Sequence, residues 1–411
     1  MHVVIFEGVL WTDLAPLAFS RPTFTLGAGT GTLLDKQLRF MKPSRLTLWV
    51  RPELEEWCRH NLIPKLPVPA QINTPLDDQP AQIVTGRTLY LTKFEQPTAP
   101  CAVVEENDLI RAAYVTKPGL TQQDAVTRSP KWLELLDLPR TMPQARFISR
   151  VWDLISWNEE ALIVDSLAFR ETARPAPADG PYHLIHGDDV LLQEGASIAP
   201  GCVLDASKGP VMIAKRASIG ANAVIQGPCF IGEYTQISPL ALIRPGTSIG
   251  PVCKVGGEVA NSIVFGCSNK AHEGYLGDSY VGKWVNLGAG TTTSNLKNTY
   301  GEVDMLIAGK TVPTGRRMLG SIIGDHTKTA IGTRLTTGSY VGYNCMVATA
   351  GLTPKNVPSF TFLTDKGAEA FQLDKAIEVA GRMLARRNRQ WTQVEANVMK
   401  YVHKTAPGVE S

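Results

Sequence analysis

The feature of this sequence that most limits its fold is an aliphatic residue at every sixth position. Between residues 213 and 255 the spacing holds without a miss, at Ile213, Ile219, Ile225, Ile231, Ile237, Ile243, Ile249 and Val255. An α-helix has a period near 3.6 residues and a strand a period of 2, so neither element produces this pattern. Short strands that turn a corner in every repeat do, because one aliphatic side chain then points inward from each face. The pattern predicts a parallel β-solenoid, and the alternative is a chance repeat in a β-sandwich.

The repeat continues on both sides of this run. Ile198 and Leu204 have the same spacing, and two later groups resume it: Val281, Leu287 and Thr293, then Ile323, Thr329, Leu335, Val341 and Val347. We therefore assign residues 181–360 to the solenoid. Both ends of such a structure expose strand edges, which need to be capped.

The segment before the solenoid has a different pattern. Over residues 1–180, apolar runs such as 3–6 and 45–50 alternate with helical patterns such as 33–41. This order favours a Rossmann-like α/β domain with a parallel sheet. The stretch 170–181, rich in Pro, Ala and Gly, is the predicted linker.

The last segment, residues 361–411, predicts a C-terminal α-helix. Its apolar residues fall on one helical face, at Ile377, Ala380, Met383, Leu384, Trp391, Val394, Val398 and Val402. Its arginines fall largely elsewhere, at Arg382, Arg386, Arg387 and Arg389. We interpret them as a solvated basic face, and phosphate binding by one of them is the alternative.

Composition narrows the class of protein. The formal net charge is +3 and 19% of residues are charged, so no excess of charge indicates nucleic acid or a membrane surface as partner. The N-terminus does not read as a signal peptide, and no apolar run of about 18 residues is present. The seven cysteines are scattered without a CxxC pair, as in proteins of a reducing cytosol. We expect a cytoplasmic protein.

The stretch NKAHEGYLGD, residues 269–278, interrupts the repeat. A strand residue of a tight solenoid points either inward or straight out from a flat face. A general base that reaches over a cleft needs a loop held by rigid coils. We therefore expect the chain to leave the coil over 256–280, with Gly256-Gly257 at the entry.

The interrupted region carries a family resemblance. The repeats resemble the left-handed parallel β-helices of hexapeptide acyltransferases. The run HEGYLGDSYVGKWVNLGAGTTTSN resembles the acetyltransferase half of the bacterial bifunctional enzyme that makes UDP-N-acetylglucosamine. The resemblance implies a homotrimer with acetyl-CoA as acyl donor. It implies His272 as general base, Arg244, Tyr275 and Asn286 as sugar-phosphate ligands, and Asn295 and Lys297 on the acyl-donor loop.

The chemistry suits these residue types independently of the resemblance. Acyl transfer to an amine requires removal of a proton and stabilisation of an oxyanion. A histidine, with an ordinary pKa near 6.5, contributes roughly 10²–10⁴-fold as a general base. Backbone N–H groups of the LGAGT corner are candidates for the oxyanion. Two positions depart from the family pattern: no lysine matches between Arg244 and His272, and Gly301 stands where a loop lysine is expected, with Lys297 and Lys310 near. An ordinary surface histidine is the alternative for His272.

The N-terminal segment contains a Gly-rich loop before a helix, LGAGTGTLLDKQLRF at 26–40. Such loops cradle nucleotide phosphates, although a tight turn is the alternative. With the hexapeptides that follow, the segment resembles sugar nucleotidyltransferases fused to an acyltransferase-type β-helix. The candidate nucleotide-binding residues are Arg21, Gly27, Gly29, Gly31 and Lys36.

The nucleotidyltransferase pattern is incomplete. Leu33 stands where the family's motif arginine is expected, and no acid follows the strand at 88–91 before Glu95. Asp108 and Asp153 are the other acids considered for Mg²⁺, which we expect only if this domain is active; the sequence assigns no metal ligands.

Together these features predict an enzyme of sugar-nucleotide metabolism. Its expected reactions are N-acetylation of an amino-sugar phosphate by acyl-CoA, nucleotidyl transfer from a nucleoside triphosphate to a sugar 1-phosphate, or both. The alternative is a catalytically degenerate protein that binds sugar nucleotides in a regulatory or structural role.

Overall fold

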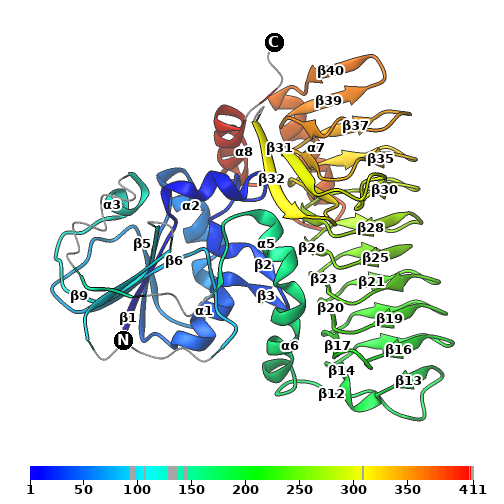
Figure 1. Ribbon diagram of the computed structural model, residues 1–411, viewed down its shortest axis with the longest axis horizontal. Coiled ribbons are helices and arrows are strands. Elements are labelled where there is room, and N and C mark those ends of the chain that lie inside the picture. The colour runs from blue at the N-terminus through cyan, green and yellow to red at the C-terminus, as the bar shows by residue number, and fades with distance from the viewer. Residues whose placement is uncertain are drawn as a thin grey trace. The chain divides into compact units, whose positions relative to one another are not determined.

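The chain forms two compact units (Figure 1). The computed structural model describes all residues except 93–98, 106–107, 128–137, 142–145, 308–309, 407 and 409–411. The first unit comprises residues 1–26, 31–150 and 391–402, and the second comprises 27–30, 151–390 and 403–411. The units therefore interleave along the chain, and the three consecutive domains 1–180, 181–360 and 361–411 stay a sequence-based prediction.

The first unit is built on a mixed seven-stranded sheet. Its strands are β1 (His2–Phe6), β4 (Arg45–Trp49), β5 (Ala70–Ile72), β6 (Ala81–Thr85), β8 (Cys101–Glu105), β9 (Asp108–Val115) and β10 (Arg140–Thr141), in the order β10-β8-β9-β6-β1-β4-β5. β1 pairs in parallel with β4 and β6, as the sequence predicts. β9 runs antiparallel to both β6 and β8, so the sheet is not wholly parallel.

Helices and short elements complete this unit. They are η1 (Val9–Leu14), η2 (Thr23–Thr25), β3 (Gly31–Thr32), α1 (Leu33–Met41), α2 (Pro52–Asn61), η3 (Ile63–Lys65), β7 (Thr88–Leu89), α3 (Gln122–Thr127) and β11 (Arg146–Phe147). α1 begins where the sequence predicts, because Thr32 and Asp35 form a capping box that satisfies two N–H groups of the first turn. The carboxyl ends of β1, β4 and β6 lie side by side in this sheet.

The second unit is the predicted parallel β-helix, and the fold class expected from the sequence is confirmed. Its longest face, called the long face below, stacks β12 (Arg174–Pro175), β14 (Val190–Leu192), β17 (Val211–Ile213), β20 (Cys229–Ile231), β23 (Thr247–Ile249), β26 (Ile263–Gly266), β29 (Tyr280–Lys283), β33 (Ser321–Ile323), β36 (Ser339–Val341) and β38 (Asn356–Val357). Successive coils pair in register, so that Ile213, Ile231 and Ile249 lie above one another in the core.

Two further faces close the coil. The second face stacks β13 (His183–Ile185), β16 (Val203–Asp205), β19 (Val224–Gln226), β22 (Leu242–Ile243), β25 (Glu258–Ala260) and β28 (Tyr275–Gly277), with β30 (Thr292–Thr293) and β35 (Arg334–Leu335) beyond them. The third face stacks β15 (Ser197–Ile198), β18 (Ser218–Ile219), β21 (Gln236–Ile237), β24 (Lys254–Val255) and β27 (Asn269–Lys270), then β34 (Lys328–Thr329), β37 (Met346–Ala348), β39 (Thr361–Thr364) and β40 (Gly367–Ala370).

Other elements cover the faces and ends. They are β2 (Gly27–Ala28), α5 (Val151–Ser156), α6 (Asn158–Phe169), η4 (Gly187–Asp189), β31 (Val303–Ile307), β32 (Lys310–Arg316), α7 (Leu373–Ala385) and α8 (Gln393–Thr405), whose last residues belong to this unit. Leu162 and Phe169 of α6 pack on Met212 and Phe230, which point outward from the long face. The long face is therefore buried on both sides at β17 and β20. The antiparallel strand β12 ends the long face, and the antiparallel strand β40 ends the third face.

The structure corrects the prediction that the chain leaves the coil over 256–280. β25, β26, β27 and β28 all pair in register with the preceding coil. The period of six is lost for another reason: the turn from Ile249 to Val264 takes fewer residues than the turn from Ile231 to Ile249, so the corners are shorter. The chain does leave the coil later, in the antiparallel hairpin β31–β32.

The predicted single C-terminal helix is two helices. α7 ends at Ala385 and α8 begins at Gln393, with Trp391 between them. The turn between them is held by Arg387, whose guanidinium donates to Val252 O and Asn269 Oδ1, each at 2.7 Å. This arginine is thus bound to the β-helix rather than solvated. None of the helices in the described part of the chain is long and apolar enough to cross a membrane.

Candidate functional site

His272 lies at the corner between the third and second faces. It follows β27, precedes β28, and its side chain is exposed. The corner is packed tightly on the next coil, because a Cβ on Gly274 would lie 2.2 Å from Thr291 O. Gly274 also has a φ of +114°, which favours glycine. The backbone around His272 is therefore fixed although its imidazole is open to solvent.

A ladder of polar side chains runs down the neighbouring second face. The Asn295 side-chain amide donates to Tyr275 Oη at 3.1 Å and to Asp278 Oδ2 at 2.5 Å. Asn261 donates to Asp278 Oδ1 at 2.7 Å. Burial, followed by the nearby Asp278 and Glu258 carboxylates, raises the pKa of Tyr275. The phenol keeps its proton at neutral pH and, having accepted from Asn295, has that proton to donate to a ligand.

Arg244 lies on the same face and is paired with a residue that sequence reasoning missed. Its guanidinium donates to Glu258 Oε1 at 3.0 Å, and both side chains are partly solvent-exposed. Glu258 stands directly opposite Tyr275 in the strand register. A phosphate that binds Arg244 would compete with Glu258 in high dielectric, where such a pair is worth about 0–1 kcal/mol.

The remaining predicted residues of the acyltransferase site are elsewhere. Asn286 lies on the third face, where its side-chain oxygen accepts from Asn269 at 3.3 Å. Lys297 donates to Glu302 O and lies 3.6 Å from Asp304 Oδ2, so it holds the start of the β31–β32 hairpin. Within one copy of the chain, Tyr275 and Asn295 thus lie together, with His272 at the adjoining corner. Asn286 lies on the other side of that corner.

Two backbone N–H groups of the NLGAGT corner, which are expected to stabilise the oxyanion, already donate to carbonyls of the chain. Leu287 N donates to Asn269 O and Gly288 N to Thr329 O. These two bonds belong to the stacking of the coils, so neither N–H group points at a substrate.

A groove leads along the third face to the histidine corner. It has a volume of about 540 Å³ and is lined by polar residues such as Ser218, Gln236 and Lys254 and by apolar residues such as Ile219, Ile237 and Ala271. Its last lining residue, Ala271, directly precedes His272. The groove therefore ends one residue before His272.

Three backbone N–H groups of the Gly-rich loop bond to side chains of this chain. Gly29 N donates to Asn158 Oδ1 at 2.7 Å and Thr30 N to Asp165 Oδ2 at 2.8 Å. Gly27 N donates to Tyr280 Oη at 2.8 Å. Side chains of the second unit thus take the N–H groups that a phosphate would need, and a Cβ on Gly29 would lie 2.3 Å from Asp165 Oδ2.

The other predicted nucleotide-binding residues lie in the first unit. Gly31 packs against Asp35, whose carboxylate accepts from Thr32 N at 2.7 Å. Lys36 is fully buried within α1 and Arg21 is 5% exposed. The sequence pattern alone gives no sign that these cations are inside.

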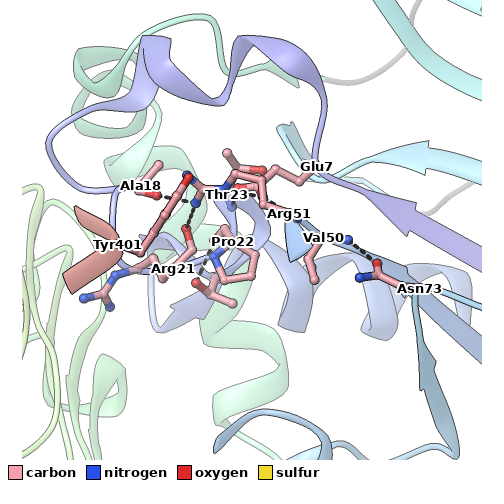
Figure 2. A network of polar contacts seen from close by, with 10 residues as sticks. Glu7, Ala18, Arg21, Pro22, Thr23, Val50, Arg51, Asn73 and Tyr401 are labelled. Atoms are coloured by element: carbon pink, nitrogen blue, oxygen red, sulfur yellow. Dashed lines mark hydrogen bonds and ion pairs between the residues drawn. The ribbon is translucent and has the colours of Figure 1, made fainter. Parts of the chain in front are cut away.

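A buried ion pair lies at the carboxyl ends of β1 and β4 (Figure 2). Arg51 Nε donates to Glu7 Oε2 at 3.0 Å, and Glu7 also accepts from Thr23 N. Burial raises the pKa of Glu7, and the Arg51 guanidinium opposes that shift. Arg51 further donates to Ala18 O at 2.7 Å and to Tyr401 Oη at 3.2 Å. The network ties residues 7–26 to β4 and α8.

Arg87 follows β6, the third strand that ends at this edge of the sheet, and its guanidinium is also hydrogen-bonded. It donates to Ile148 O and Ser149 O and lies 3.9 Å from Asp13, which accepts from Arg150 at 2.5 Å. The guanidinium groups at the strand ends are therefore bound to acceptors of the chain itself.

The described residues do not fit a metal centre. They contain no group of three His, Cys, Asp or Glu side chains placed to hold an ion. Asp153 lies 3.9 Å from Arg316, while Glu95 and the Asp108 side chain fall outside the described residues. Asp153 is the one of these three acids whose side chain the structure describes. It is thus paired with a guanidinium rather than grouped with other carboxylates.

Comparison with known proteins agrees with this two-part architecture. Residues 3–173 match the sugar nucleotidyl transferase family. The chain is 34% identical over 137 residues to the bifunctional sugar-1-phosphate nucleotidylyltransferase/acetyltransferase of Sulfurisphaera tokodaii, covering 33% of this chain and 34% of that protein. It is 37% identical over 187 residues to the bifunctional protein GlmU of Methanocaldococcus jannaschii, covering 44% and 46%. The predicted family resemblance is confirmed.

The chain spans less than half the length of these relatives. Among solved structures, LpxA from Acinetobacter baumannii covers 53% of this chain and 92% of its own, at 15% identity and a TM-score of 0.28. The register of the stacked coils, rather than this likeness, defines the fold of the second unit.

The buried pair in the first unit gives a stability prediction. Glu7→Ala leaves the Arg51 guanidinium buried without its carboxylate, and we expect a loss of about 3–5 kcal/mol in unfolding free energy. Arg59→Ala, which breaks the exposed pair with Glu55, is the matched control and should change it by less than about 1 kcal/mol. Urea unfolding of both variants measures the difference, and equal effects would contradict the role of the buried pair.

Proposed function

We propose that this chain is an acyl-CoA-dependent N-acetyltransferase acting on an amino-sugar phosphate, with His272 as general base. The observation that carries the proposal is the position of His272 at the end of the groove, beside the ladder of Tyr275, Asn295 and Asp278. An exposed imidazole on a rigid corner suits proton abstraction from a substrate that arrives from solvent. The named relatives include an acetyltransferase half.

The proposed roles follow from what each side chain can offer. His272 removes the proton from the attacking amine, whose nitrogen then bonds to the thioester carbonyl carbon as the thiolate of CoA leaves. Tyr275 donates a hydrogen bond from its phenol O–H to the sugar. Arg244 exchanges Glu258 for the substrate phosphate, where a guanidinium binds with two N–H groups. Asn295 and Lys297 are proposed to lie beside the acyl donor.

We further propose that the site is completed between copies of the chain. Asn286 is on the third face, while Tyr275 and Arg244 are on the second. In a cyclic trimer, the third face of one copy would meet the second face of the next at the His272 corner. Asn286 of one copy would then face the sugar held by the other.

This arrangement requires a stable oligomer. We expect light scattering at micromolar protein concentration to give three times the mass of the chain. A stable monomer that retains full acetyl transfer would contradict both the assembly and the shared site.

The general base is tested by His272→Ala. We expect acetyl transfer from acetyl-CoA to an amino-sugar 1-phosphate to fall by about two to four orders of magnitude, because the variant loses the imidazole that accepts the proton. His183→Ala removes another exposed histidine from β13 and should leave the rate unchanged. Wild-type turnover in His272→Ala, with an unchanged melting temperature, would remove His272 from the mechanism.

Nucleotidyl transfer in the first unit is the second candidate function, favoured by the family match over residues 3–173. Its substrates would be a nucleoside triphosphate and a sugar 1-phosphate. Arg51 and Arg87 lie at the strand ends where α/β folds bind such ligands, but each is held by the chain itself.

We therefore expect weak triphosphate binding. A phosphate that binds Arg51 or Arg87 must displace the carboxylate and carbonyl groups that already accept from them. UTP or dTTP at millimolar concentration with Mg²⁺ should raise the melting temperature by less than about 1–2 °C. Rapid pyrophosphate release from either nucleotide with a sugar 1-phosphate would contradict this expectation.

A further inference from the structure

A lysine occupies the core column directly beneath the histidine corner. Lys270 stands opposite Val255 in the register of the third face, at an inward-pointing position, and is 3% exposed. The residues that stack with Lys270 in the preceding coils of the third face are all aliphatic. A buried cation in such a column is unfavourable unless its charge and N–H groups are bound.

The ammonium group ends at the corner rather than in the core. Lys270 Nζ donates to Gly256 O at 2.7 Å and to His272 O at 3.1 Å. The two carbonyls belong to the same corner of two successive coils. Gly257 makes room for the ammonium, because a Cβ there would lie 2.8 Å from Nζ, and its φ is +68°.

The surroundings of this ammonium are acidic on two sides. Glu273 follows His272 at the corner, and Glu258 lies on β25 with Arg244 bonded to it. Burial nevertheless lowers the pKa of Lys270 to about 8, with both carboxylates opposing the shift. The ammonium is thus bonded directly to the backbone of His272 and flanked by charges of the proposed substrate face.

We infer that Lys270 is a positioning residue for His272, a role that rests on the proposed acetyl transfer. Its ammonium donates to both Gly256 O and His272 O, and so links the two corners. This link sets the height and the backbone orientation of the histidine corner above the preceding coil. A general base works only when its nitrogen is within hydrogen-bond reach of the proton, and a displacement of about 1 Å can cost on the order of 10²-fold in rate. Lys270 itself does not touch the substrate.

A second lysine that bonds to a corner carbonyl provides a control, although it is half-buried and stands in the outward row of the third face with Asn286. Lys328 Nζ donates to His326 O at 2.7 Å, and burial lowers the pKa of Lys328 to about 8 as well. Lys328 lies on β34, two coils further along the third face, so the carbonyl that it binds belongs to a different corner of the β-helix. A merely structural role for lysines that bond to corner carbonyls predicts a similar consequence for both.

The experiment compares Lys270→Met with Lys328→Met, because methionine keeps an unbranched side chain and removes the charge and the donors. For Lys270→Met we expect kcat for acetyl transfer to fall at least about tenfold with KM for acetyl-CoA changed less than about threefold. Lys328→Met should keep kcat within about twofold. Equal losses in the two variants, or wild-type kcat in Lys270→Met, would overturn the inference.

A second measurement does not depend on activity. The imidazole of His272, assigned by its loss in His272→Gln, is titrated by NMR in the wild type and both variants. We expect the pKa of His272 to rise by about 0.5 in Lys270→Met, since a nearby positive charge is removed while Glu258, Glu273 and Arg244 remain, and to stay unchanged in Lys328→Met. An unchanged titration in Lys270→Met would overturn the inference even if the protein transfers no acetyl group.

If Lys270→Met does not fold, Lys270→Gln takes its place, because the amide can still donate to one carbonyl. We expect an intermediate kcat and the same rise in the pKa of His272. A wild-type protein without acetyl transfer would refute the proposed function, whereas the His272 titration would still decide whether Lys270 sets the histidine corner.

Discussion

The in-register pairing of successive coils is the interaction on which the rest of this structure depends. Each strand pairs in parallel with the one below it, and aliphatic side chains such as Ile213, Ile231 and Ile249 stack in continuous columns. Because the backbone of each coil bonds to the next coil, side chains are placed in rows along three faces and at three corners. A chemical group that must reach a ligand can therefore stand only in an outward row or at a corner, and the proposed general base uses a corner.

The corner at His272 shows how small departures from the repeat produce a site. Shorter corners between Ile249 and Val264 shift the phase of the sequence without breaking the coil. Glycines at 257 and 274 allow close approach, one to an ammonium and one to the carbonyl of the next coil. The acidic and amide groups of the second face then bond to one another, so that Asn295, Asp278 and Tyr275 are held in one ladder. Rigidity of the coil and polarity of the corner together give a surface suited to acyl transfer.

The first unit contrasts with this openness. At the carboxyl ends of its central strands, Arg51 bonds to the Glu7 carboxylate and to backbone carbonyls (Figure 2). Arg87 likewise donates to a backbone carbonyl of the same chain. In the second unit, the N–H groups of Gly29 and Thr30 in the Gly-rich loop likewise bond to Asn158 and Asp165 of that same unit. Groups that could bind phosphates are thus satisfied internally, which lowers the free energy of the unliganded protein and opposes nucleotide binding by the same amount.

The sequence by itself determined the β-helix, the start of α1 and the residues gathered around the histidine, because each rests on local spacing. A period of six residues has one structural solution, and a capping box acts within four residues. The sequence did not determine that the coil continues through 256–280, that the C-terminal segment breaks into two helices, or that Lys270 points inward. Those outcomes depend on partners distant in the chain: Val255 for Lys270, Val252 for Arg387, and Asp165 for the Gly-rich loop. Only the tertiary structure decided them, since the burial and hydrogen bonds that favour one conformation exist only after the coils have stacked.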